Sequence, residues 1–267
     1  MEEMDQIGTE NAQVQSSNPL KSYLSFIVII GSLVMGYLIY YLVMGNPDNF
    51  ADGEVRHTPV EEGFGKWLGL FYLGGMFIGL AVALFIITLT LTIERIITLS
   101  KAGGRGRMDV FVQKVQVKLE DGDIDGAIEE CDRQRGTVGN VVKEALKKYK
   151  WAANNPDIEF ERRKLMIQKS IEEATALELP MLERHLPIIA TIVSIATLVG
   201  LIGTVVGMIK AFQALGSGGG SPDVTALSIG ISEALMNTAT GISTSTIATV
   251  AYNYFKNQID GMTYRID

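Results

Sequence analysis

Four long apolar stretches determine what this chain can fold into. Three of them run for 22 to 27 residues without a charged side chain, and a fourth spans 32 residues with a single charge, Glu233. About 20 helical residues cross the roughly 30 Å hydrocarbon core of a bilayer. We therefore predict an all-α integral membrane protein with four transmembrane helices, over residues 23–44, 67–93, 186–210 and 224–255.

The orientation of these helices follows from Lys and Arg, which are enriched in cytoplasmic loops. Four basic residues follow the second helix: Arg95, Lys101, Arg105 and Arg107. We expect residues 94–185 and both terminal tails, 1–22 and 256–267, to be cytoplasmic, with the loops 45–66 and 211–223 outside. An acidic start and the lack of a small-residue cleavage site favour a retained first helix over a signal peptide.

The predicted cytoplasmic domain between the second and third membrane helices is helical. Apolar residues recur at helical spacing in Met108–Glu120, and shorter helices are predicted at Ile124–Cys131 and Val141–Tyr149. A long charged helix from Ile158 to about Leu186 then continues into the third membrane helix as a stalk. We interpret its charges as a solvated face with i,i+4 pairs.

The remaining motifs exclude several function classes. Cys131 is the only cysteine, so no intramolecular disulfide forms, and His57 and His185 lack partners at metal-ligand spacing. The loop Gly216–Pro222 has no Lys-Ser/Thr pair of a phosphate-binding loop and is predicted to be a flexible hairpin. Basic and aromatic residues are not grouped in the sequence in a pattern suited to binding nucleic acid. We expect no enzymatic activity, no cofactor and no metal.

Glu233 lies inside a predicted membrane span, where a charged carboxylate is unfavourable in free energy. A charge at bilayer depth costs at least ~2.5–3.5 kcal/mol, so such a residue usually faces a bundle interior and marks an ion or proton path. Glu233 lies about 13–14 Å from the start of its helix, and Thr204 lies about 11–12 Å from the predicted end of the third helix. At this common depth, we expect the Thr204 hydroxyl to hydrogen-bond the Glu233 carboxylate.

Small and polar residues form a stripe on each of the last two membrane helices. Gly203-x-x-x-Gly207 is a pattern that lets helices approach closely. The expected proton path consists of Glu233, Thr204, Thr238, Asn237 and Thr197, and the expected helix-packing residues are Gly200, Gly203, Gly207 and Gly241.

A structural interpretation of the same carboxylate is a buried ion pair between Glu233 and Lys210. We disfavour it because Lys210 lies near the predicted membrane surface, where its side chain would extend outward. For Ser243, Thr246 and Thr249, a packing role alone is the preferred interpretation.

Two segments resemble the MotA/TolQ/ExbB proton-channel family, on its ExbB/TolQ side. They are VGLIGTVVGMIKAF (Val199–Phe212) and ISEALMNTATGIS (Ile231–Ser243), and a weaker similarity extends upstream. The resemblance implies that Glu233 is the essential membrane carboxylate and that Thr204 and Thr238 line its polar cavity. The chain departs from the family in having Ala196-Thr197 where Ala-Pro is common ahead of the G-T-V motif, and four predicted spans where ExbB and TolQ typically have three.

The resemblance also implies an assembly and a task. It suggests a pentamer in a bacterial inner membrane, enclosing a single-span partner of the ExbD/TolR kind with its own membrane aspartate, and driving a TonB-like protein with the proton motive force. A TolQ-like envelope motor, or a gliding or flagellar stator, would use the same chemistry. A secondary transporter and a membrane scaffold are the alternatives from other classes, and the role of the first helix is left open.

Overall fold

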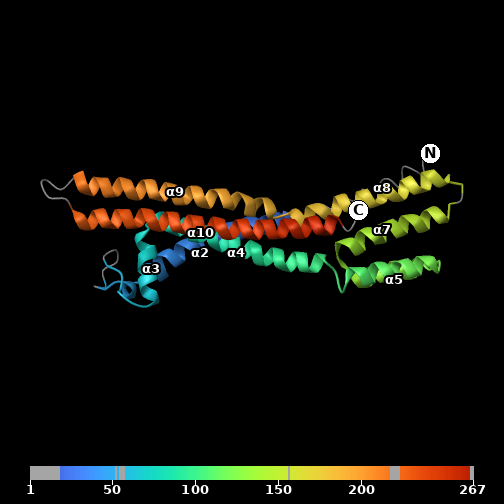
Figure 1. Cartoon of the computed structure of the whole chain (residues 1–267), viewed down its shortest axis with the longest axis horizontal. Coiled ribbons are helices and arrows are strands. Elements are labelled where there is room, and N and C mark those ends of the chain that lie inside the picture. Colours follow the sequence, from blue (N-terminus) through green and yellow to red (C-terminus); the bar gives the residue numbers. More distant parts are fainter. Residues whose placement is uncertain (1–18, 52, 54–57, 156, 217–222, 265–267) are drawn as a thin grey trace. The chain divides into compact units, whose positions relative to one another are not determined.

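The computed structural model describes residues 19–51, 53, 58–155, 157–216 and 223–264, which are helical apart from loops and one isolated bridge between Phe50 and Pro59. Parts of the predicted N-terminal tail and Gly/Ser hairpin, and His57, lie outside these residues. The main helices (Figure 1) are α2 (Pro19–Leu38), α3 (Phe64–Leu73), α4 (Met76–Ala102), α5 (Met108–Glu120), α6 (Ile124–Gln134), α7 (Gly136–Ala153), α8 (Phe160–Glu183), α9 (Leu186–Gly216) and α10 (Val224–Thr263).

The chain divides into two compact units. Unit 1 comprises Met1–Leu89 and Ser194–Ser245, and unit 2 comprises Thr90–Val193 and Thr246–Asp267. Helices α4, α9 and α10 contribute residues to both units. Each unit is considered separately below.

Three of the described helical segments are long and apolar enough to cross a membrane: Ile27–Met44, Met76–Ala102 and Phe160–Gly216. They overlap the first three predicted spans, and the second begins and ends nine residues later than predicted. Helix α10 is 40 residues long, but Ser, Thr, Asn and Glu side chains lower its apolar content. The fourth span therefore stays a prediction, since its polar face must be covered by protein before the helix can cross a bilayer.

The second predicted membrane helix is not continuous. Its first part forms α3, which ends at Leu73, and α4 begins only at Met76. Between them Gly75 adopts φ +73°, a left-handed conformation that favours glycine. The amide groups of Gly74 and Gly75 donate to the carbonyls of Phe71 and Tyr72, which closes the end of α3. The break lies within unit 1, where it takes part in the site described below.

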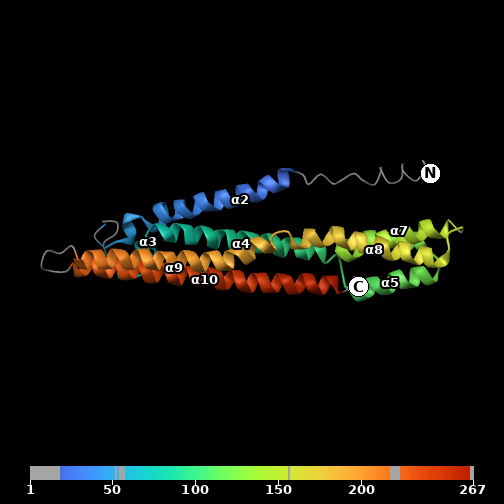
Figure 2. The ribbon, with the colours of Figure 1, turned by 90° about the horizontal axis from the view of Figure 1, so that it is seen from above.

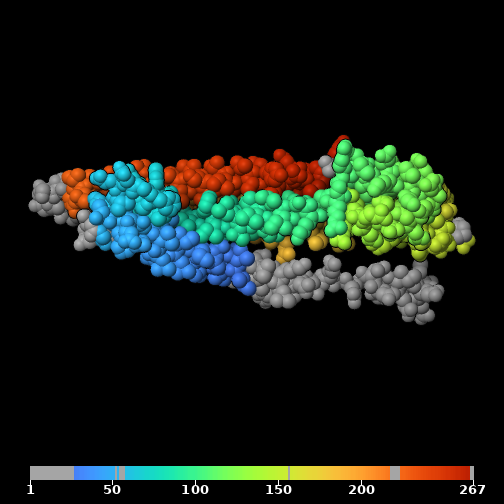
Figure 3. Space-filling view, turned by 90° about the horizontal axis from the view of Figure 1, so that it is seen from below, coloured from blue at the N-terminus to red at the C-terminus, as the bar shows by residue number. Residues whose placement is uncertain are grey.

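The N-terminal helix supports this break. A Cβ on Gly36 would lie 2.7 Å from the Cβ of Ala83, so α2 and α4 pack closely within unit 1, as their adjoining surfaces in Figure 3 show. Helix α2 continues into a π-helical turn, Ile39–Met44. There the Tyr40 ring stacks on Tyr72 at 4.7 Å, and the Tyr40 hydroxyl donates to the Tyr72 carbonyl at 3.2 Å.

Unit 2 contains helices α5 to α8, each in contact with its neighbour along the chain. Their bounds lie close to the predicted ones, and α5 coincides with Met108–Glu120. Phe111, Val115, Ala127 and Cys131 belong to one buried cluster. The Asp123 side chain caps α6 by accepting from the Gly126 amide at 2.8 Å, because the first amides of a helix lack partners within it.

A buried guanidinium in unit 2 joins α4 to the end of α8 and to the turn that follows it. Arg95 of α4 is 2% exposed, pairs with Glu94 at 2.6 Å, and donates to the Leu182 carbonyl of α8 at 3.0 Å. His185 Nδ1 lies 2.9 Å from Glu94. The predicted stalk passes through a two-residue turn here, because α8 ends at Glu183 and α9 starts at Leu186.

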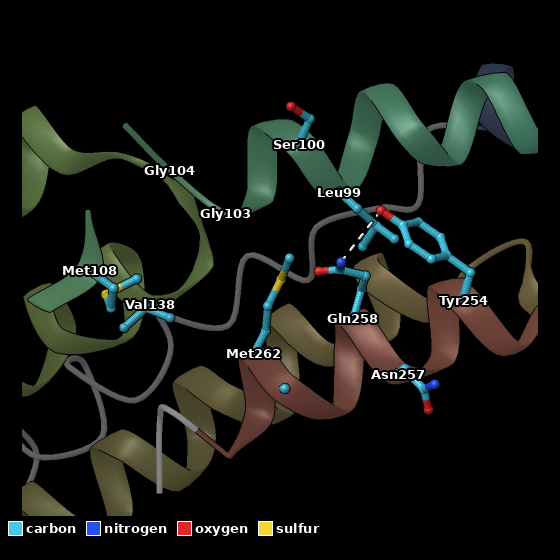
Figure 4. A pocket seen from close by; sticks show the side chains of 11 residues that line it. Leu99, Ser100, Gly103, Gly104, Met108, Val138, Tyr254, Asn257, Gln258 and Met262 are labelled. Atoms are coloured by element: carbon cyan, nitrogen blue, oxygen red, sulfur yellow. Dashed lines mark hydrogen bonds between the residues drawn. The ribbon is translucent and has the colours of Figure 1, made fainter. Parts of the chain in front are cut away.

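A cavity of about 620 Å³ in unit 2 lies between the end of α4 and the C-terminal turns of α10 (Figure 4). The labelled side chains include Leu99, Met108 and Met262, and Gln258 donates to the Tyr254 hydroxyl at 3.5 Å. None of the described residues that line it carries a formal charge at neutral pH.

The environment of Cys131 predicts an unreactive thiol. Its burial raises the pKa to about 11, with the neighbouring Asp132 charge adding to the effect. Because only the thiolate reacts, N-ethylmaleimide at pH 8 should modify the native protein on the order of 100-fold more slowly than the unfolded protein. Mass spectrometry over a labelling time course checks this, and equal rates in the native and unfolded states would contradict it.

Candidate functional site

Within unit 1, α9 and α10 approach each other closely through glycines (Figure 2). A Cβ on Gly207 would lie 2.7 Å from the Ala234 backbone nitrogen, and a Cβ on Gly241 would lie 2.9 Å from the Cα of Gly200. The same applies to Gly203, where a Cβ would lie 2.5 Å from Asn237. All four glycines singled out in the sequence therefore occupy positions where a larger side chain would separate the helices.

The Glu233 carboxylate is buried at this contact. The residue is 5% exposed, and its Oε1 accepts a hydrogen bond of 2.6 Å from Nζ of Lys210. The Lys210 side chain is 52% exposed, so the pair joins a buried anion to a cation at the surface of the unit. The prediction that Lys210 extends outward was wrong. It assumed that the third membrane helix ends near Lys210, whereas α9 continues to Gly216, about 9 Å further.

Asn237 links the helix that carries Glu233 to the break between α3 and α4. The residue is 1% exposed, and its Nδ2 donates to the Gly74 carbonyl at 2.7 Å and to the Glu233 carbonyl at 2.9 Å. Gly74 ends α3, and its carbonyl is available because the helix stops there. The role of Asn237 is thus to join α10 to this break.

Two threonine hydroxyls form a second polar contact. Thr204 Oγ1 hydrogen-bonds Thr238 Oγ1, and it also lies 3.2 Å from the Gly200 carbonyl and 3.4 Å from the Ala234 carbonyl. The expected bond from Thr204 to Glu233 is thus replaced by one to Thr238, five residues further along α10. Thr197 lies on α9 as expected, and it is exposed.

The break between α3 and α4 lies directly against the carboxylate. A Cβ on Gly75 would overlap Oε1 of Glu233. A cavity of about 290 Å³ borders the same atoms and is lined by this break, by Lys210 and by one face of α10. Gly75 was not among the residues expected at the site. Its signal was the Gly74-Gly75 pair inside an apolar run.

The arrangement suits the binding and release of a proton. A buried carboxylate has a charged and a neutral form whose energies depend strongly on the surroundings. Here a lysine, an asparagine and a cavity lie beside one such group, and two hydroxyls lie one turn away. Among the described residues no cluster of His, Cys, Asp or Glu can hold a metal ion.

Comparison with known proteins covers the part of the chain that carries these residues. Residues 134–267 match the family model described as the MotA/TolQ/ExbB proton channel family. Helices α9 and α10 both lie inside this match.

Individual relatives agree with the family match. A putative biopolymer transport protein ExbB homolog from Methanothermobacter thermautotrophicus is 29% identical over 209 residues, 78% of this chain and 70% of that protein. Biopolymer transport protein ExbB from Pseudomonas putida is 30% identical over 69% of this chain and 53% of that protein. Tol-Pal system protein TolQ from Haemophilus influenzae is 36% identical over 32% of this chain and 37% of that protein.

The matches to the latter two relatives thus span about half and about a third of their lengths. With the family model covering half of the chain and its polar helix pair, this all-α, multi-pass membrane protein belongs to the MotA/TolQ/ExbB proton channel family.

Proposed function

We propose that this chain is the proton-conducting subunit of an ExbB-like motor in a bacterial inner membrane. The observation that carries the proposal is the buried Glu233 carboxylate on α10, paired with Lys210 and bordered by a cavity. The location of the site inside the region matched by the proton channel family supports it further. No bond is made or broken in this function other than those to a proton.

In this mechanism a proton reaches Glu233, converts the carboxylate to a carboxylic acid and releases Lys210 from the ion pair. The charged and neutral forms of a buried group differ in energy. Protonation therefore changes the relative stability of the alternative contacts that the α9–α10 pair can make with a neighbouring subunit or partner. Thr204 and Thr238 provide hydroxyls that receive and pass on hydrogen bonds beyond the carboxylate. Repeated protonation and release thereby turn proton flow into movement of a partner.

The proposed assembly is a pentamer around a single-span partner of the ExbD/TolR kind with a membrane aspartate. In it, α10 forms the fourth membrane span, because its polar face is covered by neighbouring subunits and the partner. Both termini are on the cytoplasmic side, and the α9–α10 loop is periplasmic. The load proposed for this motor is a TonB-like protein that energises outer-membrane transport.

A TolQ-like envelope motor is the second candidate. The 36% identity to the Tol-Pal system protein TolQ of Haemophilus influenzae favours it. The two candidates share the proton chemistry and differ in the partner and load, so the identity of the partner distinguishes them.

Neutralising the carboxylate tests the function. Glu233→Gln keeps the size of the side chain and removes its ability to bind a transferable proton. We expect proton flux through the reconstituted complex, followed with a pH-sensitive dye in liposomes, to fall to the level of protein-free liposomes. Glu172→Gln, on an exposed part of α8, is the matched control and should conduct like the wild type. Normal flux through an assembled Glu233→Gln complex would exclude the proposal.

The break between α3 and α4 provides a test of site geometry. Gly75→Ala introduces both a left-handed alanine and a methyl group that overlaps Glu233, whereas Gly63→Ala, at φ +82°, has no atom within 4 Å to contact. Because a displaced functional group loses activity steeply, Gly75→Ala should lower proton flux by about tenfold or more. Gly63→Ala should have little effect. Equal loss in both variants would show that backbone strain alone is responsible.

Composition of the native complex tests the assembly. Gentle detergent extraction followed by intact mass spectrometry should show five copies of this chain with fewer copies of a single-span, aspartate-bearing protein. The soluble domain of that protein would indicate whether the load is TonB-like or Tol-Pal-like. A lone monomer or dimer would contradict the proposed assembly.

A further inference from the structure

The N-terminal helix of unit 1 ends in an unusual way. The turn that follows α2, Ile39–Met44, is π-helical, and the Gly45 amide donates to the Tyr40 carbonyl, five residues back, at 3.0 Å. Asn49 Nδ2 donates to the last two carbonyls of this turn at 2.7 and 3.0 Å, so the end of the turn is satisfied by a side chain. Such π-helical turns are rare and are found frequently at functional sites.

The π-helical turn directs one tyrosine into the interior of unit 1. Tyr40 is 1% exposed, whereas the next residue, Tyr41, is 57% exposed. The Tyr40 ring belongs to one buried cluster with Tyr72 of α3, and Met236 of α10 packs against this cluster. A side chain of the N-terminal segment is therefore connected by packing both to the break between α3 and α4 and to the helix that carries Glu233.

The Tyr40 hydroxyl contacts the backbone at this break. It donates to the Tyr72 carbonyl at 3.2 Å, and the same carbonyl accepts from the Gly75 amide at 3.1 Å. A carbonyl oxygen has two lone pairs, so it can accept from both donors at once. The bond from Gly75 closes the left-handed turn after α3. Tyr40 thus adds a side-chain donor to the carbonyl on which this turn depends.

The turn fixed in this way forms one wall of the site around the carboxylate. A Cβ on Gly75 would overlap Oε1 of Glu233, and the Gly74 carbonyl accepts from Asn237 of α10 at 2.7 Å. Tyr72, Gly75 and Glu233 line the same cavity of about 290 Å³. A displacement of this turn would therefore change both the space beside the carboxylate and the hydrogen bond to α10.

We propose that Tyr40 is a positioning residue for proton binding at Glu233. Its hydroxyl fixes the Tyr72 carbonyl, and this carbonyl holds the turn at Gly75 in the place that proton transfer at the carboxylate requires. Tyr40 acts through the backbone of residues 72–75 and not by contact with the proton. The inference rests on the proposed function, because it concerns the same carboxylate, and it gives the N-terminal helix a role in proton transfer.

Removal of a single hydroxyl tests this role. Tyr40→Phe keeps the stacked ring and removes only the hydrogen-bond donor. Tyr41→Phe makes the same chemical change at the adjacent, exposed position and is the matched control. The complete complex of each variant is reconstituted in liposomes, its assembly is checked by intact mass spectrometry, and proton flux per complex is followed with a pH-sensitive dye.

We expect Tyr40→Phe to assemble like the wild type and to show about fivefold less proton flux per complex, the factor that corresponds to the loss of one hydrogen bond. Tyr40→Leu, which also removes the ring, should lower the flux by about tenfold or more, because a displaced functional group loses activity steeply. Tyr41→Phe should conduct like the wild type. If Tyr40 only filled space, the phenylalanine ring would replace it and Tyr40→Phe would conduct normally.

An infrared measurement separates a positioning role from a structural one. The carbonyl stretch of protonated Glu233 is identified as the band that Glu233→Gln lacks, and its frequency depends on the hydrogen bonds and the space around the acid. Tyr40→Phe should displace this band, whereas Tyr41→Phe should leave it at the wild-type frequency.

Four outcomes would overturn the inference while Glu233→Gln still abolishes flux and the proposed function stands. They are normal flux in Tyr40→Phe, an equal loss of flux in Tyr41→Phe, an infrared band of Glu233 that Tyr40→Phe does not move, and failure of Tyr40→Phe to assemble. A wild-type complex that carries no proton flux would overturn the proposed function and the inference together.

Discussion

The burial of one negative charge is the constraint on which unit 1 depends. Transferring a carboxylate out of water costs several kcal/mol, and this cost must be offset by a cation or by hydrogen bonds. The chain provides the cation from the neighbouring helix, through the 2.6 Å contact between Lys210 and Glu233. A half-exposed lysine is a suitable partner, because its long side chain keeps one end near water while its ammonium group reaches inward.

The backbone around the carboxylate is arranged to make room for it. Glycine at position 75 leaves space that any side chain would fill, and the left-handed turn there interrupts what would otherwise be a single helix. The carbonyl exposed by this interruption is taken up by Asn237. The π-helical turn after α2 then holds the break in place through the stacked rings of Tyr40 and Tyr72. The N-terminal helix, whose role the sequence left open, therefore contributes to the geometry of the site.

The sequence predicted the elements of the site better than their contacts. A lone carboxylate in an apolar run, and glycines at regular spacing on two helices, are visible without coordinates because each depends on one helix at a time. The ion pair between Lys210 and Glu233 was disfavoured because the predicted depth of Lys210 in the membrane depends on where α9 ends. The ends of helices are poorly defined by sequence. The break at Gly75 was missed because an apolar run that contains two glycines has the same average hydropathy whether or not it is interrupted. The contacts of Arg95 with Leu182 and His185 join residues about 90 positions apart, which no local pattern reveals.

The glycine contacts between α9 and α10 bear on how the pair responds to force. Where helices meet through long side chains, part of a small displacement can be taken up by a change of side-chain rotamer. At Gly200, Gly207 and Gly241 the backbones themselves are in contact, and no side chain is present to absorb a displacement. At these positions a displacement of one helix is therefore passed directly to the backbone of the other. Any push delivered at Glu233 is carried by both helices together, with little of the displacement lost as local deformation between them.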